Sequence, residues 1–188
     1  MIGARTIVAG LSLAVMLIGG CLPRAVSGGP SEVQPDRRVF HRKAGFSIIP
    51  PEGYRDHGPT FWHVMNFLGP DAGNFTVHFN VWVHVDKGHD IEQAGPLLRK
   101  AATTYLPKYR MQEEGFRGLP PGLSYFAHGT YTWEGRDLAC VIYCIRGNNG
   151  YVYAVTFSAP VEAFDTHRPD FESAIGTVRT TAANSNSQ

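Results

Sequence analysis

The sequence has no excess of charge of either sign. Its 188 residues include 17 Lys and Arg against 16 Asp and Glu, a formal net charge of +1. Arg5 is the only charged residue among the first twenty, so the remainder of the chain is neutral overall. Proteins that bind nucleic acid usually carry a basic surface that neutralises phosphates. The charge balance therefore argues against nucleic-acid binding.

Cysteine is also scarce, with three residues at positions 21, 140 and 144. Cys140 and Cys144 fall in one strand-like segment, where four residues of extended chain span roughly 13 Å. A disulfide needs Cα atoms within about 7 Å of each other. The C-x-x-C spacing of redox and metal sites is missing as well. We expect both residues to be buried free thiols.

Apolar runs long enough to cross a bilayer comfortably are missing, but the N-terminus carries a shorter one. Residues 7–18 are uncharged and apolar, follow Arg5 and precede Gly19-Gly20-Cys21. This pattern resembles a bacterial lipoprotein signal with its lipobox, which implies cleavage before Cys21 and acylation of that thiol, for example with palmitate. An ordinary signal peptide, or a membrane anchor with an incidental cysteine, is the alternative. Retention in the inner membrane would call for Asp at position 22. The Leu22 found there favours a location in the outer membrane, with the protein facing the periplasm.

The chain divides into four parts. We predict a signal peptide over residues 1–20 and a flexible tether over 21–38, which is rich in Pro, Gly, Ser and charge. One α+β domain follows over 39–180, and residues 181–188 form a disordered polar tail. A hydrophobic content of 43% suits a single domain whose core needs no disulfides.

The segment from Phe75 to Val85 is the centre of the predicted domain. Its odd-numbered residues are all apolar, while the even-numbered ones are mixed, which indicates a long strand with one face fully buried. Two short strands near Val39 and a strand from Phe61 to Leu68 precede it. A three-strand meander over 123–133, 138–146 and 151–158 follows, with Asn149-Gly150 as its clearest hairpin signal.

Two amphipathic segments are predicted to cover the sheet. The first runs from Asp90 to Leu106, with Asp90 and Gln93 as a possible capping box, or starts instead at Pro96. The second runs from Pro169 to Val178. The predicted fold is therefore an antiparallel sheet of about six to seven strands sandwiched between helices, an α/β/α arrangement of the α+β class.

Two stretches carry a resemblance to a known family. GFSIIPPEGY (residues 45–54) and YVYAVTFSAPVEAFDTHRPDFESAIGTVR (residues 151–179) resemble the opening and closing segments of the PsbP-like fold. That superfamily includes PsbP, the Ran-release factor and bacterial DcrB-type lipoproteins. The resemblance implies an antiparallel sheet between helices, mostly non-catalytic adaptor roles and no shared cofactor. It brings no active-site residues to this chain.

The candidate binding face combines His63 with His78, Asn80 and Trp82. If Leu68 faces Phe75, His63 opposes Asn80 and lies diagonal to His78, about 7–8 Å away at Cα. Two histidines and a third donor could bind a metal. The alternative, which we favour, is that these groups hydrogen-bond to one another and to the backbone, because a metal site needs three converging ligands and supporting contacts. We expect neither a metal nor a cofactor.

Catalytic motifs are missing from the sequence. It contains no G-x-S-x-G, and the glycines of residues 115–122 match neither a P-loop nor a dinucleotide fingerprint, so this stretch is predicted to be a loop. The first hypothesis is a lipid-anchored, non-catalytic envelope protein that binds another envelope protein or helps an assembly. A small-ligand or metal-binding envelope module is the alternative, and a hydrolase is the third.

Overall fold

The computed structural model describes residues 32–33, 37–60, 63–86, 88 and 90–181. The predicted signal peptide, Cys21 with most of the predicted tether, and residues 182–188 lie outside these ranges. Within them, neither helix has the length and apolar character needed to cross a bilayer.

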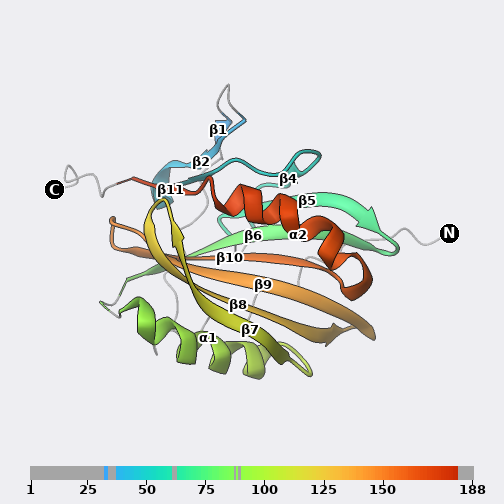
Figure 1. Ribbon diagram of the computed structural model, residues 1–188. Helices are drawn as coiled ribbons and strands as arrows, with labels where there is room; N and C mark the ends of the chain where they lie inside the picture. The colour runs from blue at the N-terminus through green and yellow to red at the C-terminus, as the bar shows by residue number, and fades with distance from the viewer. Residues whose placement is uncertain (1–31, 34–36, 61–62, 87, 89, 182–188) are drawn as a thin grey trace.

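A seven-stranded antiparallel sheet forms the centre of the molecule (Figure 1). Its strand order is β4-β5-β6-β10-β9-β8-β7. The strands are β4 (Arg55–Asp56), β5 (Met65–Ala72), β6 (Phe75–Val85), β7 (Arg110–Leu119), β8 (Gly122–Trp133), β9 (Arg136–Arg146) and β10 (Tyr151–Pro160). The predicted long strand is β6, and it pairs with β5 on one side and β10 on the other. The predicted meander is β8-β9-β10, where Gly150 takes the positive φ of +79° that the hairpin turn requires.

A second, small sheet joins the two ends of the domain. Its strands, in spatial order, are β1 (Glu32–Val33), β2 (Val39–His41), β3 (Phe46–Ile48) and β11 (Arg179–Thr180). β1 lies in the stretch predicted to be tether. The connection between β2 and β3 contacts the β9–β10 hairpin, where Tyr153 Oη and Asn149 Nδ2 both donate to the Ala44 carbonyl.

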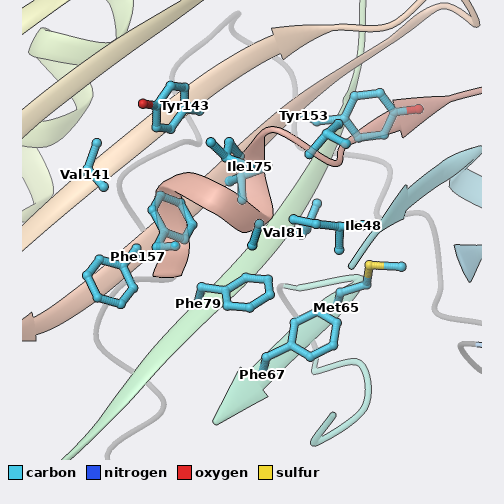
Figure 2. Close-up of a cluster of buried hydrophobic side chains, with 14 of the residues drawn as sticks. Ile48, Met65, Phe67, Phe79, Val81, Val141, Tyr143, Tyr153, Phe157 and Ile175 are labelled. Carbon is cyan, nitrogen blue, oxygen red and sulfur yellow. The ribbon is translucent and has the colours of Figure 1, made fainter. Parts of the chain in front are cut away.

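Two helices cover opposite faces of the large sheet. Helix α2 (Val161–Ile175) packs over β9 and β10, and helix α1 (Ile91–Tyr105) packs over β7, β8 and β9. Beneath α2 the core is rich in aromatic rings, several of which appear in Figure 2. Phe67 stacks on Phe79 with ring centroids 4.4 Å apart, and Phe157 stacks on Phe171 of α2 at 4.9 Å. The predicted α/β/α layering of an α+β fold is confirmed.

Both helices run through a proline. Pro96 lies inside α1, so the first helix follows the predicted range from Asp90 to Leu106 and not the alternative start at Pro96. Pro169 lies inside α2, so the predicted start of the second helix is eight residues too late. An interior proline costs a helix about 3 kcal/mol. In α2 this cost is offset because Phe164 and Phe171, two turns apart on one side, are both buried. Asp90 is the N-cap of α1 but makes no capping hydrogen bond through its side chain, so the predicted capping box does not form.

The stretch predicted to be a loop at residues 115–122 is instead the end of β7, a turn and the start of β8. β7 is an edge strand and most of its side chains are exposed, so it lacks the alternating apolar pattern that marks a half-buried strand. Gly115 and Gly118 also lower its apparent strand propensity. These two features explain why the sequence pattern failed here.

Candidate functional site

The residues predicted to form a binding face lie on the α1 side of the large sheet. His78, Asn80 and Trp82 alternate along β6, so their side chains share one face. All three are buried. Helix α1 packs mainly over β7, β8 and β9, and the predicted residues therefore lie on the part of this face beside the helix.

The register of β5 differs from the one expected. Asn66, rather than His63, is opposite Asn80, and Leu68 is opposite His78. The paired part of β5 also continues to Ala72, so the turn before Phe75 is shorter than predicted. As a result Met65 and Phe67 lie in the core beneath α2, whereas the expected register would have placed them on the same face as Trp82.

His63 nevertheless reaches the same face as Trp82. The two rings meet edge to face, with centroids 4.9 Å apart. The Nδ1 atom of His63 lies 2.8 Å from Thr60 Oγ1, while its Nε2 is buried and has no hydrogen-bond partner among the described residues. Burial, and secondarily the nearby His78, lowers the pKa of His63 to about 3. His63 is therefore a neutral ring at physiological pH.

His78 is held by its own strand. Its Nδ1 lies 3.2 Å from the carbonyl oxygen of Thr76, which can only accept, so Nδ1 carries the proton. Burial lowers the pKa of His78 as well. Both histidines of the predicted face are thus uncharged. The other side chains on this face, which the next paragraph names, carry no charge either.

Three further polar residues, which the sequence pattern missed, complete this face. Asn66 on β5, Asn80 on β6 and Thr156 on β10 are directly opposite one another, and His78 is opposite Ser158 on β10. We call these five residues, Asn66, His78, Asn80, Thr156 and Ser158, the polar face. Thr156 and Ser158 alternate with Val155 and Phe157, a pattern visible in the sequence that marks one side of β10 as polar.

The polar face is not fully hydrogen-bonded. Thr156 Oγ1 donates to Asn80 Oδ1. Asn66 is 0% exposed, yet neither its amide nitrogen nor its amide oxygen has a hydrogen-bond partner among the described residues. A buried polar group without a partner costs about 1–3 kcal/mol. Such groups need an explanation, and bound water or a polar ligand are two of those available.

The described residues include no group of three His, Cys, Asp or Glu side chains that could hold a metal ion. Cys140 and Cys144 lie on β9 as free, buried thiols, as predicted. Burial raises the pKa of each thiol to about 12.

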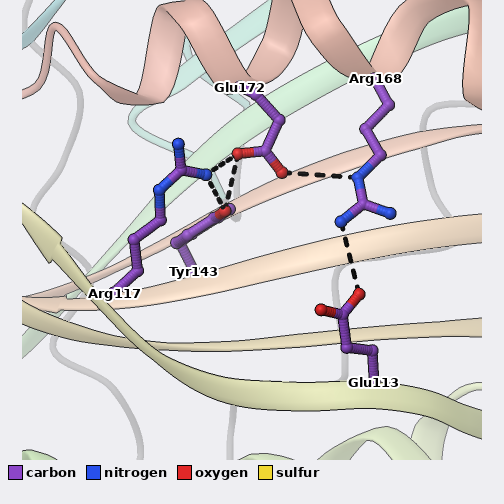
Figure 3. Close-up of polar contacts among 5 residues, drawn as sticks. All are labelled: Glu113, Arg117, Tyr143, Arg168 and Glu172. Carbon is purple, nitrogen blue, oxygen red and sulfur yellow. Dashed lines mark hydrogen bonds and ion pairs between the residues drawn. The ribbon is translucent and has the colours of Figure 1, made fainter.

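A second polar cluster ties the edge strand β7 to helix α2 (Figure 3). Arg117 on β7 donates to Glu172 on α2 and to the hydroxyl of Tyr143, at 2.9 Å in the second case. Arg168 bridges Glu172 at 3.5 Å and Glu113 at 3.4 Å. All four charged groups are satisfied within the cluster, which indicates a structural role.

A small cavity of about 30 Å³ lies where β6, β9 and β10 meet the start of α1. Its walls include His84, Ile91, Cys144 and Val152. Arg146, which also lines it, is paired with Asp86. The volume suits about one water molecule, so the cavity is too small for a substrate.

Comparison with known proteins places the fold. Neither a family model nor a curated protein matches the sequence. Among solved structures, LpqN of Mycobacterium tuberculosis, described as involved in cell envelope biogenesis, is similar over 81% of this chain and 90% of its own, with 11% identity and a TM-score of 0.62. Cyanobacterial PsbP from Synechocystis is similar over 87% of this chain and 99% of its own, with 12% identity and a TM-score of 0.57.

The yeast Ran-binding protein Mog1p also matches, over 73% of this chain and 91% of its own, with 8% identity and a TM-score of 0.52. PsbP and Mog1p have the fold that the two sequence stretches resemble. The chain has the PsbP-like fold, and the expected resemblance is confirmed.

Proposed function

We propose that this protein is a lipid-anchored, non-catalytic component of a bacterial cell envelope, and that its PsbP-like domain binds another envelope protein or supports an assembly. The observation that carries the proposal is the apolar segment 7–18 followed by Gly19-Gly20-Cys21. Cleavage there would leave Cys21 as the acylated first residue, joined by a short linker to the domain. Leu22 favours the outer membrane, with the domain in the periplasm.

The fold neighbours support the envelope part of the proposal. LpqN, with the same fold, is described as involved in cell envelope biogenesis. Mog1p is described as a Ran-binding protein, so the fold also occurs in a protein named for binding another protein. Fold alone does not carry function, so both are support and not assignment.

The described side chains support a binding role over a catalytic one. The two thiols sit within β9 with pKa values raised to about 12, so little thiolate forms near neutral pH. His63 and His78 are neutral and buried, and His78 is opposite Ser158 in the sheet, with Cys140 one strand further away.

The anchor is tested by expressing the full chain in bacteria with an alkyne-tagged fatty acid. We expect label on the wild type and on a Cys140→Ser control, and none on Cys21→Ser, with mass spectrometry placing the mature N-terminus at Cys21. In vivo cross-linking from the folded domain should then recover a recurring envelope protein. A mature chain that starts at another residue, or that lacks fatty acid, would refute the anchor.

A small-ligand function is the second candidate, and the orphaned amide of Asn66 favours it. The polar face offers neutral donors and acceptors beside an aromatic ring, which suits an uncharged polar ligand more than an ion. Native mass spectrometry of the protein purified from its membrane should show a bound small molecule, and Asn66→Leu should lose it. A purified protein with no added mass, and with metal content at background, would count against this candidate.

A further inference from the structure

The hairpin of β7 and β8 exposes two large apolar side chains. Phe116 is 48% exposed and Leu123 is 49% exposed. Phe116 is opposite Tyr125 and Leu123 is opposite Gly118, so Phe116 and Leu123 are diagonal neighbours on one face. Gly118 lies on the same face and adds no side chain. The two residues therefore form one small apolar surface, which we call the hairpin patch.

Helix α1 stops short of the hairpin patch. Gly95 of α1 packs directly on the ring of Tyr125, and Arg99, one turn further on, pairs with Glu114 at 2.8 Å. From there the helix runs along β8 away from the hairpin tip, as shown by the backbone bond from Thr132 N to the carbonyl of Pro107, just beyond its end. Phe116 and Leu123 thus lie past the part of the face that α1 covers.

The other face of the hairpin is fixed in place. Leu119 is buried in the core beneath α2, and Arg117 contacts Glu172 and Tyr143 (Figure 3). The hairpin is therefore held to the domain through one face and presents the hairpin patch outward on the other.

The hairpin lies at the end of the domain where the chain enters. Arg38 donates to the carbonyl of Thr177 at 2.9 Å, just after α2, while Arg117 contacts Glu172 in the same helix. Five residues correspond to roughly 8 Å along a helix. Figure 1 shows the tip of the β7–β8 hairpin toward the same end of the molecule as β2 and β11.

The size of the hairpin patch distinguishes between a protein partner and a lipid bilayer. Two half-exposed side chains offer on the order of 200 Å², whereas a specific protein–protein interface buries about 1,200–2,000 Å². The patch alone is too small for a stable dimer. A bilayer needs no such area if the chain is already held on it, and the residues from Cys21 to Glu32, where the chain joins the small sheet, can span at most about 40 Å.

We propose that Phe116 and Leu123 insert into the headgroup and acyl boundary of the phospholipid bilayer that holds Cys21, and so orient the domain on the membrane. This inference rests on the proposed function, because the anchor supplies the proximity that two side chains cannot. Interfacial segments bury apolar side chains about 5–10 Å into this boundary, a depth that two exposed apolar side chains on one face can reach.

The test uses the full lipidated chain, purified from bacterial membranes and reconstituted into phosphatidylcholine vesicles. A Leu123→Cys variant carries an environment-sensitive fluorophore, and Asn74→Cys, at the exposed β5–β6 turn at the opposite end of the sheet, is the matched control. The label at 123 should show blue-shifted emission and should be quenched by brominated acyl chains. The label at 74 should show neither effect.

A second variant, Phe116→Ser in the Leu123→Cys background, should lose most of the bromine quenching while its circular dichroism stays unchanged. A label at 123 that behaves like the label at 74, in vesicles that float with the protein, overturns the insertion and leaves the anchor intact. Cross-linking between two copies at 123 without bromine quenching overturns it in favour of self-association. Failure of the protein to float with the vesicles overturns the anchor and this inference with it.

Discussion

Stability at acidic pH is the sharpest test of the buried histidine at position 63. In the folded protein its pKa is lowered to about 3, mainly by burial, and the residue is 2% exposed. In the unfolded chain an ordinary histidine has a pKa of about 6.5. Between these values the unfolded state binds a proton that the folded state does not, so the free energy of unfolding falls as the pH falls below 6.5. Above that range the contribution of His63 is constant.

The size of the effect follows from the interval between the two pKa values. A pH of 5 lies about 1.5 units below the pKa of His63 in the unfolded chain. Protonation of His63 alone therefore stabilises the unfolded state by about 2 kcal/mol at this pH. The slope below pH 6 approaches about 1.4 kcal/mol per pH unit. For a domain of ordinary stability, about 5–15 kcal/mol, this is a large fraction.

Urea unfolding across a series of pH values measures this slope. The variant His63→Gln keeps a polar side chain near Thr60 and removes the titration, so its curve should be flatter than the wild type by about one proton below pH 6. Asn74→Gln, at an exposed position on the β5–β6 turn, changes no titrating group and should keep the wild-type slope. His78 and the other buried histidines add the same pH dependence to the free energy of unfolding of the wild type and of both variants. An unchanged slope in His63→Gln would refute the burial assigned to this ring.

Two further predictions concern packing and thiol reactivity. Gly95→Ala should destabilise the domain by about 1–3 kcal/mol in chemical unfolding, because the added Cβ would lie 2.9 Å from the Tyr125 ring and outweighs the better helix propensity of alanine. Gly118→Ala, with nothing within 4 Å, should be neutral or slightly stabilising. Cys140 and Cys144 should not react with a thiol reagent at mildly alkaline pH until the protein is unfolded, and prompt reaction in the folded state would contradict their burial within β9.

The periodic segments of the chain could be predicted because their pattern and their burial coincide. The alternation in residues 75–85 corresponds to β6, with Val77, Phe79 and Val81 beneath α2. The Asn149-Gly150 turn places the β9–β10 pairing because few other residues tolerate its backbone. Pro169 lies inside α2 although proline disfavours a helix. The burial of its neighbours in the tertiary structure outweighs this local preference, and a local sequence pattern cannot show that burial.

Only some residues of the candidate site could be predicted by the same reasoning. His78, Asn80 and Trp82 were found because they share a strand, and their shared face follows from the alternation alone. The partners Asn66 and Thr156 come from other strands, and their place opposite Asn80 depends on registers that a sequence does not fix. A shift of one residue in β5 would have moved Asn66 into the core and brought its neighbours to this face. Register, more than composition, therefore defines the polar face.

The two faces of the sheet differ in a way that bears on function. The face beneath α2 is filled by stacked aromatic rings, and the buried polar atoms without a partner there, Tyr54 Oη and His128 Nε2, belong to aromatic side chains of this packing. The other face keeps the amide of Asn66 buried and without a partner among the described residues, at a cost that an apolar substitution would remove. Natural sequences break such local rules mostly where activity requires it. Asn66→Leu should therefore raise the free energy of unfolding by about 1–3 kcal/mol in protein free of small molecules. A loss of stability in that variant would mean that the amide is satisfied in solution, and the polar face would then be structural.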